Sequence, residues 1–188
     1  EPLAMVVAQT RAIAEDAARL VDLDVELLPA VTDPEAGLDC ASPKALLDSP
    51  GNLVAKHTMK FGDAESAFAH APLVVKRRYR LEKGGGHSLE ARGVAARFDA
   101  LEERLTVWDS TQMPHRTKAV LAGQLGLEDD KVRVITPDVG GGFGPKAPFH
   151  PEELAVPAAA LALGVPVKWS EDRAENFTAA VLERTQIW

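Results

Sequence analysis

Hydrophobic positions near the start of the chain follow a helical spacing between two short apolar segments. Apolar residues recur every three or four positions across 13–21, and Thr10 precedes them as a candidate N-cap. Residues 5–8 form an apolar run, and residues 24–28 alternate between polar and apolar side chains. The pattern predicts a strand, an amphipathic helix and a second strand, which together form a β-α-β unit.

The rest of the chain predicts a mixture of strands and helices. Residues 33–52 carry several prolines and glycines, which are typical of a loop or linker. The patterns beyond it predict strands at 53–59, 73–81, 93–98, 104–109, 131–136 and 165–169, and helices at 63–70, 114–125 and 151–163. Gly126 and Gly164 are suited to end the last two helices, and Pro157 favours a kink or a late start in the final one. The predicted fold class is α+β (mixed α/β), with two domains.

Composition and charge exclude several classes of protein. A hydrophobic content of 46% supports a packed core, and a net charge of −7 leaves no excess of Lys and Arg for a general nucleic-acid binder. Cys40 is the only cysteine, so neither an internal disulfide nor a zinc site built from thiolates can form. No run approaches the roughly 18 apolar residues that span a bilayer, and no signal peptide is visible. We expect a cytoplasmic protein with no membrane span.

Both ends of the chain look interrupted. The first residues read as a strand already under way, without an initiating Met, and residues 185–188 read as a strand cut short. We therefore expect the chain to be a piece of a longer protein.

A glycine-rich loop is the most informative stretch of the sequence. It follows the β-branched segment 132–136 and contains Gly140, Gly141, Gly142, Phe143 and Gly144. Glycine lets backbone N–H groups approach a ligand closely, which suits an anionic or oxo-rich group. Pro145 and Ala147 stand where a nucleoside-triphosphate loop needs Gly and Ser or Thr, and the glycine spacing does not fit a dinucleotide site. The loop predicts a ligand other than a nucleoside triphosphate.

Other polar residues carry weaker signals. Gln112 follows a predicted strand, so its amide could contact a ligand or cap the next helix. His87, Glu90 and Arg92 lie together, but such a group is more typical of structural hydrogen bonds. The same holds for His115 and the segment 150–153, where zinc spacing is absent. Around Arg173, a surface ion network with Asp172 and Glu175 is expected, and the residues 145–148 suggest a stiff turn.

Five ordered blocks of the chain resemble the large subunit of the molybdenum hydroxylases, the family of xanthine dehydrogenase, aldehyde oxidase and aerobic carbon monoxide dehydrogenase. The blocks are residues 6–18 with 27–31, 87–93, 110–115, 139–146 and 169–176. They occur in family order over nearly the whole chain, and one glycine loop alone would be weak evidence.

The resemblance implies roles for particular residues. Gln112 matches the glutamine beside the molybdenum oxo ligand, and Gly140 to Gly144 match the loop that approaches the cofactor. A pterin dithiolene would hold the molybdenum, with no metal ligand from this chain. The block that ends in Glu90 and Arg92 would support the cofactor region. The family's catalytic glutamate would lie downstream, outside these residues.

One departure narrows the implied substrate. Ala147 stands where purine-oxidising members have a carboxylate that holds the substrate. The resemblance thus argues against xanthine and leaves an aldehyde, an N-heterocycle or carbon monoxide, oxidised with water-derived oxygen.

The resemblance also implies an organisation. Residues 1–52 would be the end of a small hammerhead-like domain and a linker, and residues 53–188 the first part of a molybdopterin-binding domain. Iron–sulfur clusters and FAD would lie on partner subunits or domains, in a dimer of multi-subunit units. The segment alone is expected to be inactive.

Two other functions are weighed against this one. A non-catalytic relic or interaction module would keep the fold without the cofactor, and Ala147 mildly favours it. A nucleotide-binding β-α-β protein would need a ribose-binding acid about 20 residues after the loop, but the first acid beyond the final helix is Glu171.

Overall fold

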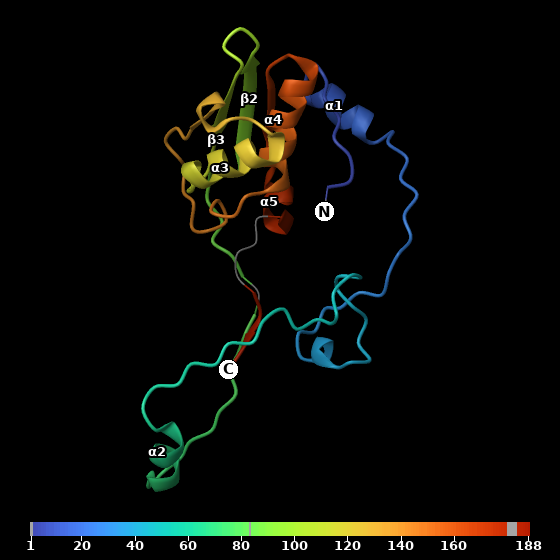
Figure 1. Cartoon of the computed structure of the whole chain (residues 1–188). Helices are drawn as coiled ribbons and strands as arrows, with labels where there is room; N and C mark the ends of the chain where they lie inside the picture. The colour runs from blue at the N-terminus through green and yellow to red at the C-terminus, as the bar shows by residue number, and fades with distance from the viewer. Residues whose placement is uncertain (1, 83, 180–183) are drawn as a thin grey trace. The chain divides into compact units, whose positions relative to one another are not determined.

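The computed structural model describes residues 2–82, 84–179 and 184–188 (Figure 1). The chain divides into two compact units. One combines the N-terminal segment up to Asp22 with the segment that ends at Arg184, and the other comprises Leu23–Glu82 and Thr185–Trp188. The predicted domain boundary after residue 52 follows a resemblance rather than compactness, and it stays a prediction.

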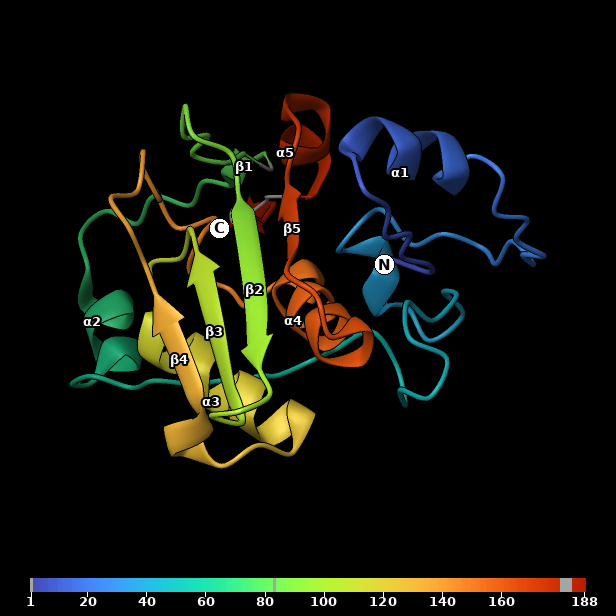
Figure 2. The ribbon, with the colours of Figure 1, turned by 90° about the horizontal axis from the view of Figure 1, so that it is seen from above.

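A four-stranded mixed sheet forms the centre of the first unit. Its order is β4-β3-β2-β5, with β3 parallel to β4 and the other pairs antiparallel. The strands are β2 (Gly93–Asp99), β3 (Arg104–Asp109), β4 (Val132–Ile135) and β5 (Val167–Ser170). Helix α3 (Pro114–Leu125) packs against β4, and α4 (Pro151–Leu163) packs against β2 and β5, on the same face of the sheet (Figure 2).

The core lies between this face and the two helices. Alternate side chains of β2 and β3 are buried, as the period of a strand requires. They meet apolar side chains from one face of α3 and one face of α4. The buried core consists of Val94, Ala96, Leu105, Val107, Leu121, Ala122, Val132, Val156, Ala160 and Val167. The predicted mixture of strands and helices is confirmed.

Helix ends in this unit follow the sequence signals. Gly126 and Gly164 both have a φ of 66°, the left-handed conformation that suits glycine after a helix. Helix α4 begins at Pro151 and continues through the buried Pro157, so a late start is wrong. Beyond β5, helix α5 (Arg173–Ala179) occupies a stretch for which no helix was predicted.

The first helix is confirmed, but the β-α-β unit around it is wrong. Helix α1 (Arg11–Ala18) is capped by the Thr10 hydroxyl, which accepts from the Ile13 N–H at 3.3 Å. Residues 5–8 and 24–28 are not strands. A strand needs a partner for its backbone groups, and neither segment is paired with a strand.

The second unit contains little regular structure. Helix α2 (Ala64–His70) is capped by Asp63, and residues Ala36–Leu38 form one 3-10 turn. Strand β1 (Arg80–Leu81) pairs antiparallel with β6 (Gln186–Ile187). The predicted strand at 53–59 is absent and that at 73–81 is reduced to its last two residues, because no neighbouring strand pairs with the rest.

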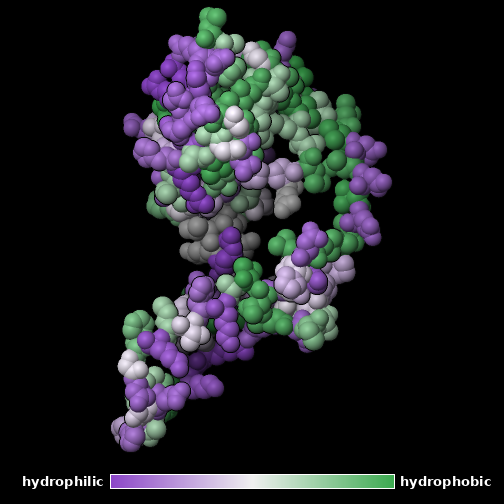
Figure 3. Space-filling model, viewed as in Figure 1, coloured by the Kyte–Doolittle hydropathy of each residue, from purple (hydrophilic) through white to green (hydrophobic). Residues whose placement is uncertain are grey.

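Large apolar side chains of this second unit are exposed to solvent, as Figure 3 shows in green. Val54 is 97% exposed and Phe61 is 84% exposed. Among the helices of the described residues, none combines the length and apolar character needed to cross a bilayer.

The core assignment predicts a large effect for one leucine. Leu105 is 0% exposed, so Leu105→Ala removes buried methyl groups and leaves a cavity. We expect the free energy of unfolding to fall by about 2–5 kcal/mol in equilibrium chemical denaturation. Leu101 lies in the turn between β2 and β3 and is 97% exposed, so Leu101→Ala is the matched control. An equal loss from Leu101→Ala would contradict the assigned core.

Candidate functional site

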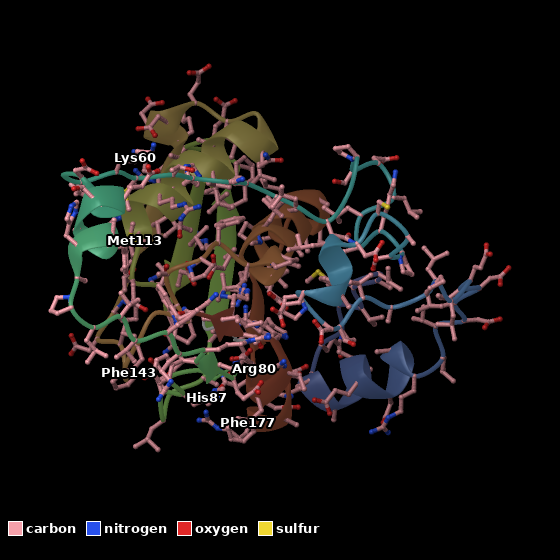
Figure 4. All side chains as sticks on the ribbon, turned by 90° about the horizontal axis from the view of Figure 1, so that it is seen from below. Lys60, Arg80, His87, Met113, Phe143 and Phe177 are labelled. Carbon is pink, nitrogen blue, oxygen red and sulfur yellow. The ribbon has the colours of Figure 1, made fainter. Side chains whose placement is uncertain are left out.

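The glycine loop adopts a conformation that ordinary side chains rarely allow. Gly141 has a φ of 98° and Gly144 a φ of 96°. Phe143, with a φ of 51°, is one of two described non-glycine residues in the left-handed region. Its side chain is 68% exposed, so it does not act as a buried plug (Figure 4).

Gly140, Gly141 and Gly142 each lie so close to another side chain that a Cβ atom would not fit in this conformation. A Cβ atom at Gly140 would lie 2.5 Å from Cβ of Glu90. At Gly141 it would lie 2.7 Å from the Phe143 ring, and at Gly142 it would lie 2.4 Å from Cδ of Gln112. The loop is therefore packed against side chains from segments ahead of β2 and after β3.

The backbone donors of this loop divide into two groups. The N–H groups of Gly140 and Gly144 donate to Glu90 and Gln112, at 2.6 and 2.9 Å. Among the described residues, the N–H groups of Gly141, Gly142 and Phe143 donate to no protein acceptor. Consecutive free donors of this kind suit an anionic or oxygen-rich ligand.

Gln112 contacts the loop rather than its own helix. Its Oε1 accepts the hydrogen bond from Gly144, and its backbone N–H donates to the Lys146 carbonyl at 2.9 Å. Its Nε2 donates to no acceptor among the described residues, and the residue is exposed. The helix-capping alternative is wrong, and the side chain retains a free donor beside the loop.

Glu90 joins the loop to a buried lysine. The Oε2 atom of Glu90 accepts from the Gly140 N–H, from Lys146 Nζ at 2.8 Å and from Ser110 Oγ at 3.1 Å. Burial by itself raises the pKa of Glu90, but the hydrogen bonds from Lys146, Gly140 and Ser110 outweigh it and lower the pKa below its ordinary value. The carboxylate is therefore charged and cannot readily act as a proton donor.

Arg92 lies in a second network, in which its own side chain and that of Glu171 are buried and that of Glu152 is 26% exposed. Its guanidinium donates twice to Glu171 Oε1, at 2.6 and 2.9 Å, and once to Glu152 at 3.2 Å. It also lies 5.4 Å from the centroid of the Trp169 ring. Burial by itself raises the pKa of Glu171, but hydrogen bonds from Arg92 and Asn176 hold it below its ordinary value. Both members of the pair are charged.

The expected surface ion network around Arg173 is wrong. The Arg173 guanidinium donates to the carbonyls of Ser88 and Leu89, at 2.9 and 2.6 Å, and thus positions the segment ahead of Glu90. Asp172 and Glu175 instead accept from each other's backbone N–H groups at the start of α5.

Two histidines near the site, His87 and His150, have structural contacts. His87 bonds Asn176 at 3.2 Å and packs edge-on against Phe177, with ring centroids 4.8 Å apart (Figure 4). His150 bonds the Pro145 carbonyl at 2.8 Å, and His115 lies at the start of α3. No group of metal-binding side chains occurs within the described residues, and Cys40 is exposed.

Asp109, at the end of β3, and Glu153, in the first turn of α4, are a buried pair of acids. Burial raises the pKa of Asp109 to about 6 and, with the Asp109 charge adding to it, the pKa of Glu153 to about 8. Oδ2 of Asp109 has no partner among the described residues. Glu153 also accepts from the His150 N–H at 3.1 Å at the start of α4.

Sequence reasoning missed Lys146, Ser110 and Arg173 as contributors to the site. The tight turn expected at Pro145 is present, with the Ala147 N–H donating to the Gly144 carbonyl at 2.9 Å. Lys146 in this turn is nonetheless 1% exposed. A charged residue directly after the glycine loop was the available signal, but the sequence pattern did not show its burial.

A comparison with protein families decides the assignment. Residues 46–188 match the model of the molybdopterin cofactor-binding domain. The chain belongs to this family. Its membership confirms the resemblance read from the five sequence blocks.

Two relatives and one solved structure are similar to this chain over nearly its whole length. The nicotine 6-hydroxylase large subunit of Paenarthrobacter nicotinovorans is 43% identical over 95% of this chain and 22% of its own length. The carbon monoxide dehydrogenase large chain of Hydrogenophaga pseudoflava is 33% identical over 98% of this chain and 24% of its own length. The crystal structure of quinoline 2-oxidoreductase from Pseudomonas putida 86 matches with a TM-score of 0.84 and 39% identity, over 90% of this chain and 22% of that one. The chain thus spans less than a quarter of these relatives.

The buried ion pair of this molybdopterin-domain chain predicts a large loss of stability. Arg92→Met leaves the carboxylate of Glu171, whose side chain is 0% exposed, without its partner. We expect a loss of about 3–5 kcal/mol in the free energy of unfolding. Arg19→Met breaks an ion pair with Asp16 whose side chains are both 77% exposed, and should change stability little. Equal losses in chemical denaturation would refute the importance of the buried pair.

The acid pair predicts a pH dependence. Because Asp109 and Glu153 have raised pKa values, the stability they contribute is complete below their unfolded pKa values and is lost as pH rises towards about 8. Glu153→Gln keeps an acceptor for His150 but cannot ionise. Its melting temperature relative to the native protein should therefore be higher at about pH 8 than at about pH 5. The same difference in melting temperature at both pH values would contradict the raised pKa of Glu153.

Proposed function

We propose that this chain forms one wall of the molybdenum-cofactor site of a larger molybdenum hydroxylase. The observation that carries the proposal is the group of free N–H donors at Gly141, Gly142 and Phe143, on a loop where side chains are excluded. A tight turn without a ligand would not need three consecutive free N–H donors. Glycines cost conformational entropy on folding, which a binding role offsets.

The residues present fit such a cofactor. The N–H groups of Gly141, Gly142 and Phe143 would bind its oxygen-rich part, and Nε2 of Gln112 would donate to an oxygen atom of the bound group. Gln112 is neutral, so it can stay hydrogen-bonded while the charge of the bound group changes. When bound, the cofactor supplies a metal centre that accepts electrons from the substrate carbon. The general base would be contributed from outside these residues.

The proposed substrate class is an N-heterocycle. The names of two relatives, a nicotine 6-hydroxylase and a quinoline 2-oxidoreductase, support this choice over an aldehyde or carbon monoxide. Ala147 stands directly after the Lys146 turn and offers no side-chain charge, which suits a neutral ring better than a charged one. An uncharged wall would favour apolar contact with the ring face.

Electron transfer in this proposal takes place on other parts of the assembly. With one exposed cysteine, the chain cannot ligate an iron–sulfur cluster. We therefore place iron–sulfur clusters and FAD on partner subunits or domains, in a cytoplasmic dimer of multi-subunit units.

A pair of matched glycine variants tests the proposal in the full-length enzyme. Gly142→Val places a branched side chain against Gln112 and over the free donors, so molybdenum and pterin content should fall. Gly123→Val changes an exposed position of α3 where a Cβ meets nothing within 4 Å, so the cofactor content should stay at the native level. Metal analysis and pterin fluorescence measure both.

The clash at Gly142 involves a flexible side chain, so this variant should still fold, which circular dichroism checks. Native cofactor content in folded Gly142→Val would sink the assignment of the loop.

A further inference from the structure

Lys146 is a buried charge with contacts on two sides of the site. Its Nζ donates to Glu90 Oε2 at 2.8 Å and to Ser110 Oγ at 2.9 Å. Its carbonyl accepts from the Gln112 N–H at 2.9 Å and from the Thr111 hydroxyl at 3.1 Å. A lysine whose side chain is 1% exposed must be paired, because an unpaired buried ammonium is strongly destabilising.

Glu90 extends this contact to the glycine loop. The carboxylate oxygen that accepts from Lys146 also accepts from the Gly140 N–H, at 2.6 Å. The Gly140 carbonyl in turn accepts from the Glu90 N–H at 3.4 Å. A Cβ at Gly140 would lie 2.5 Å from Cβ of Glu90, so this contact requires glycine at position 140. Hydrogen bonds to charged groups are stronger than those between neutral groups.

We propose that Lys146 and Glu90 are positioning residues that fix the glycine loop relative to Gln112. The carboxylate fixes the start of the loop at Gly140, and the lysine carbonyl fixes Gln112, which accepts from Gly144 at the end of the loop. The pair thereby preorganises the free N–H groups between these two points before a ligand binds. Only the effect on cofactor binding rests on the proposed function, because the loop geometry is a property of the protein itself.

Hydrogen exchange tests this positioning role on the full-length protein. Lys146→Met keeps the apolar stem but removes the charge, so the hydrogen-bonded N–H groups at the two ends of the loop, those of Gly140 and Gly144, should exchange about tenfold faster. Lys118→Met is the control, because Lys118 of α3 forms its ion pair, of 2.6 Å, with Asp129 of the 3-10 turn Asp129–Lys131 and not with a residue of the loop. It should leave exchange in the loop unchanged.

A second set of variants keeps the proposal testable if Lys146→Met folds poorly. Glu90→Gln retains an acceptor for Gly140, and should accelerate loop exchange less than Glu90→Ala does. The double variant Glu90→Gln with Lys146→Met should resemble Lys146→Met alone, since the two residues act as one unit.

A spectroscopic measurement on the loaded enzyme separates positioning from general support. Displacing the loop should change the line shape of the electron paramagnetic resonance signal of the partly reduced molybdenum, whereas simple destabilisation would only reduce its intensity. Native exchange in the loop, or acceleration spread evenly over the whole unit, would overturn the proposal. Absence of molybdenum from the native protein would instead refute the proposed function, while the exchange comparison would still decide the role of Lys146.

Discussion

The geometry of the site depends on the buried ion pair between Arg92 and Glu171. Arg92 lies directly before β2 and Glu171 directly after β5, and their side chains are 5% and 0% exposed. Glu152 of α4 and Asn176 of α5 complete the network. A charge buried without its partner is strongly destabilising. The ion pair is therefore stable only when the start of β2, the end of β5 and the first turns of α4 and α5 come together.

A series of hydrogen bonds connects this network to the glycine loop. Arg173 of α5 fixes the carbonyls of Ser88 and Leu89, which brings Glu90 to Gly140. Lys146 supplies the opposite charge from the far side of the loop. The site is thus made of backbone N–H groups that a surrounding set of charged side chains positions, and those charges are already paired within the protein. A neutral amide, Gln112, is the polar side chain left with a free donor beside the loop among the described residues.

Local signals predicted elements that depend on local interactions. Thr10, Gly126 and Gly164 begin or end helices as expected, and the alternation in β2 and β3 is that of a half-buried sheet. Strands at 5–8, 24–28 and 53–59 were predicted from the same patterns and are absent, because pairing depends on distant segments. Likewise, the glycine loop could be found from spacing, but the burial of Lys146 depends on contacts 36 and 56 residues away.

The central claim is that the free donors of the glycine loop bind a molybdenum cofactor. The most direct measurement is the molybdenum and pterin content of the native full-length protein, purified with its partner subunits from a host that makes the cofactor. We expect molybdenum and pterin in equal, near-stoichiometric amounts per large subunit. A folded protein with neither would contradict the claim, and would leave the three consecutive free N–H donors of Gly141, Gly142 and Phe143 without a ligand.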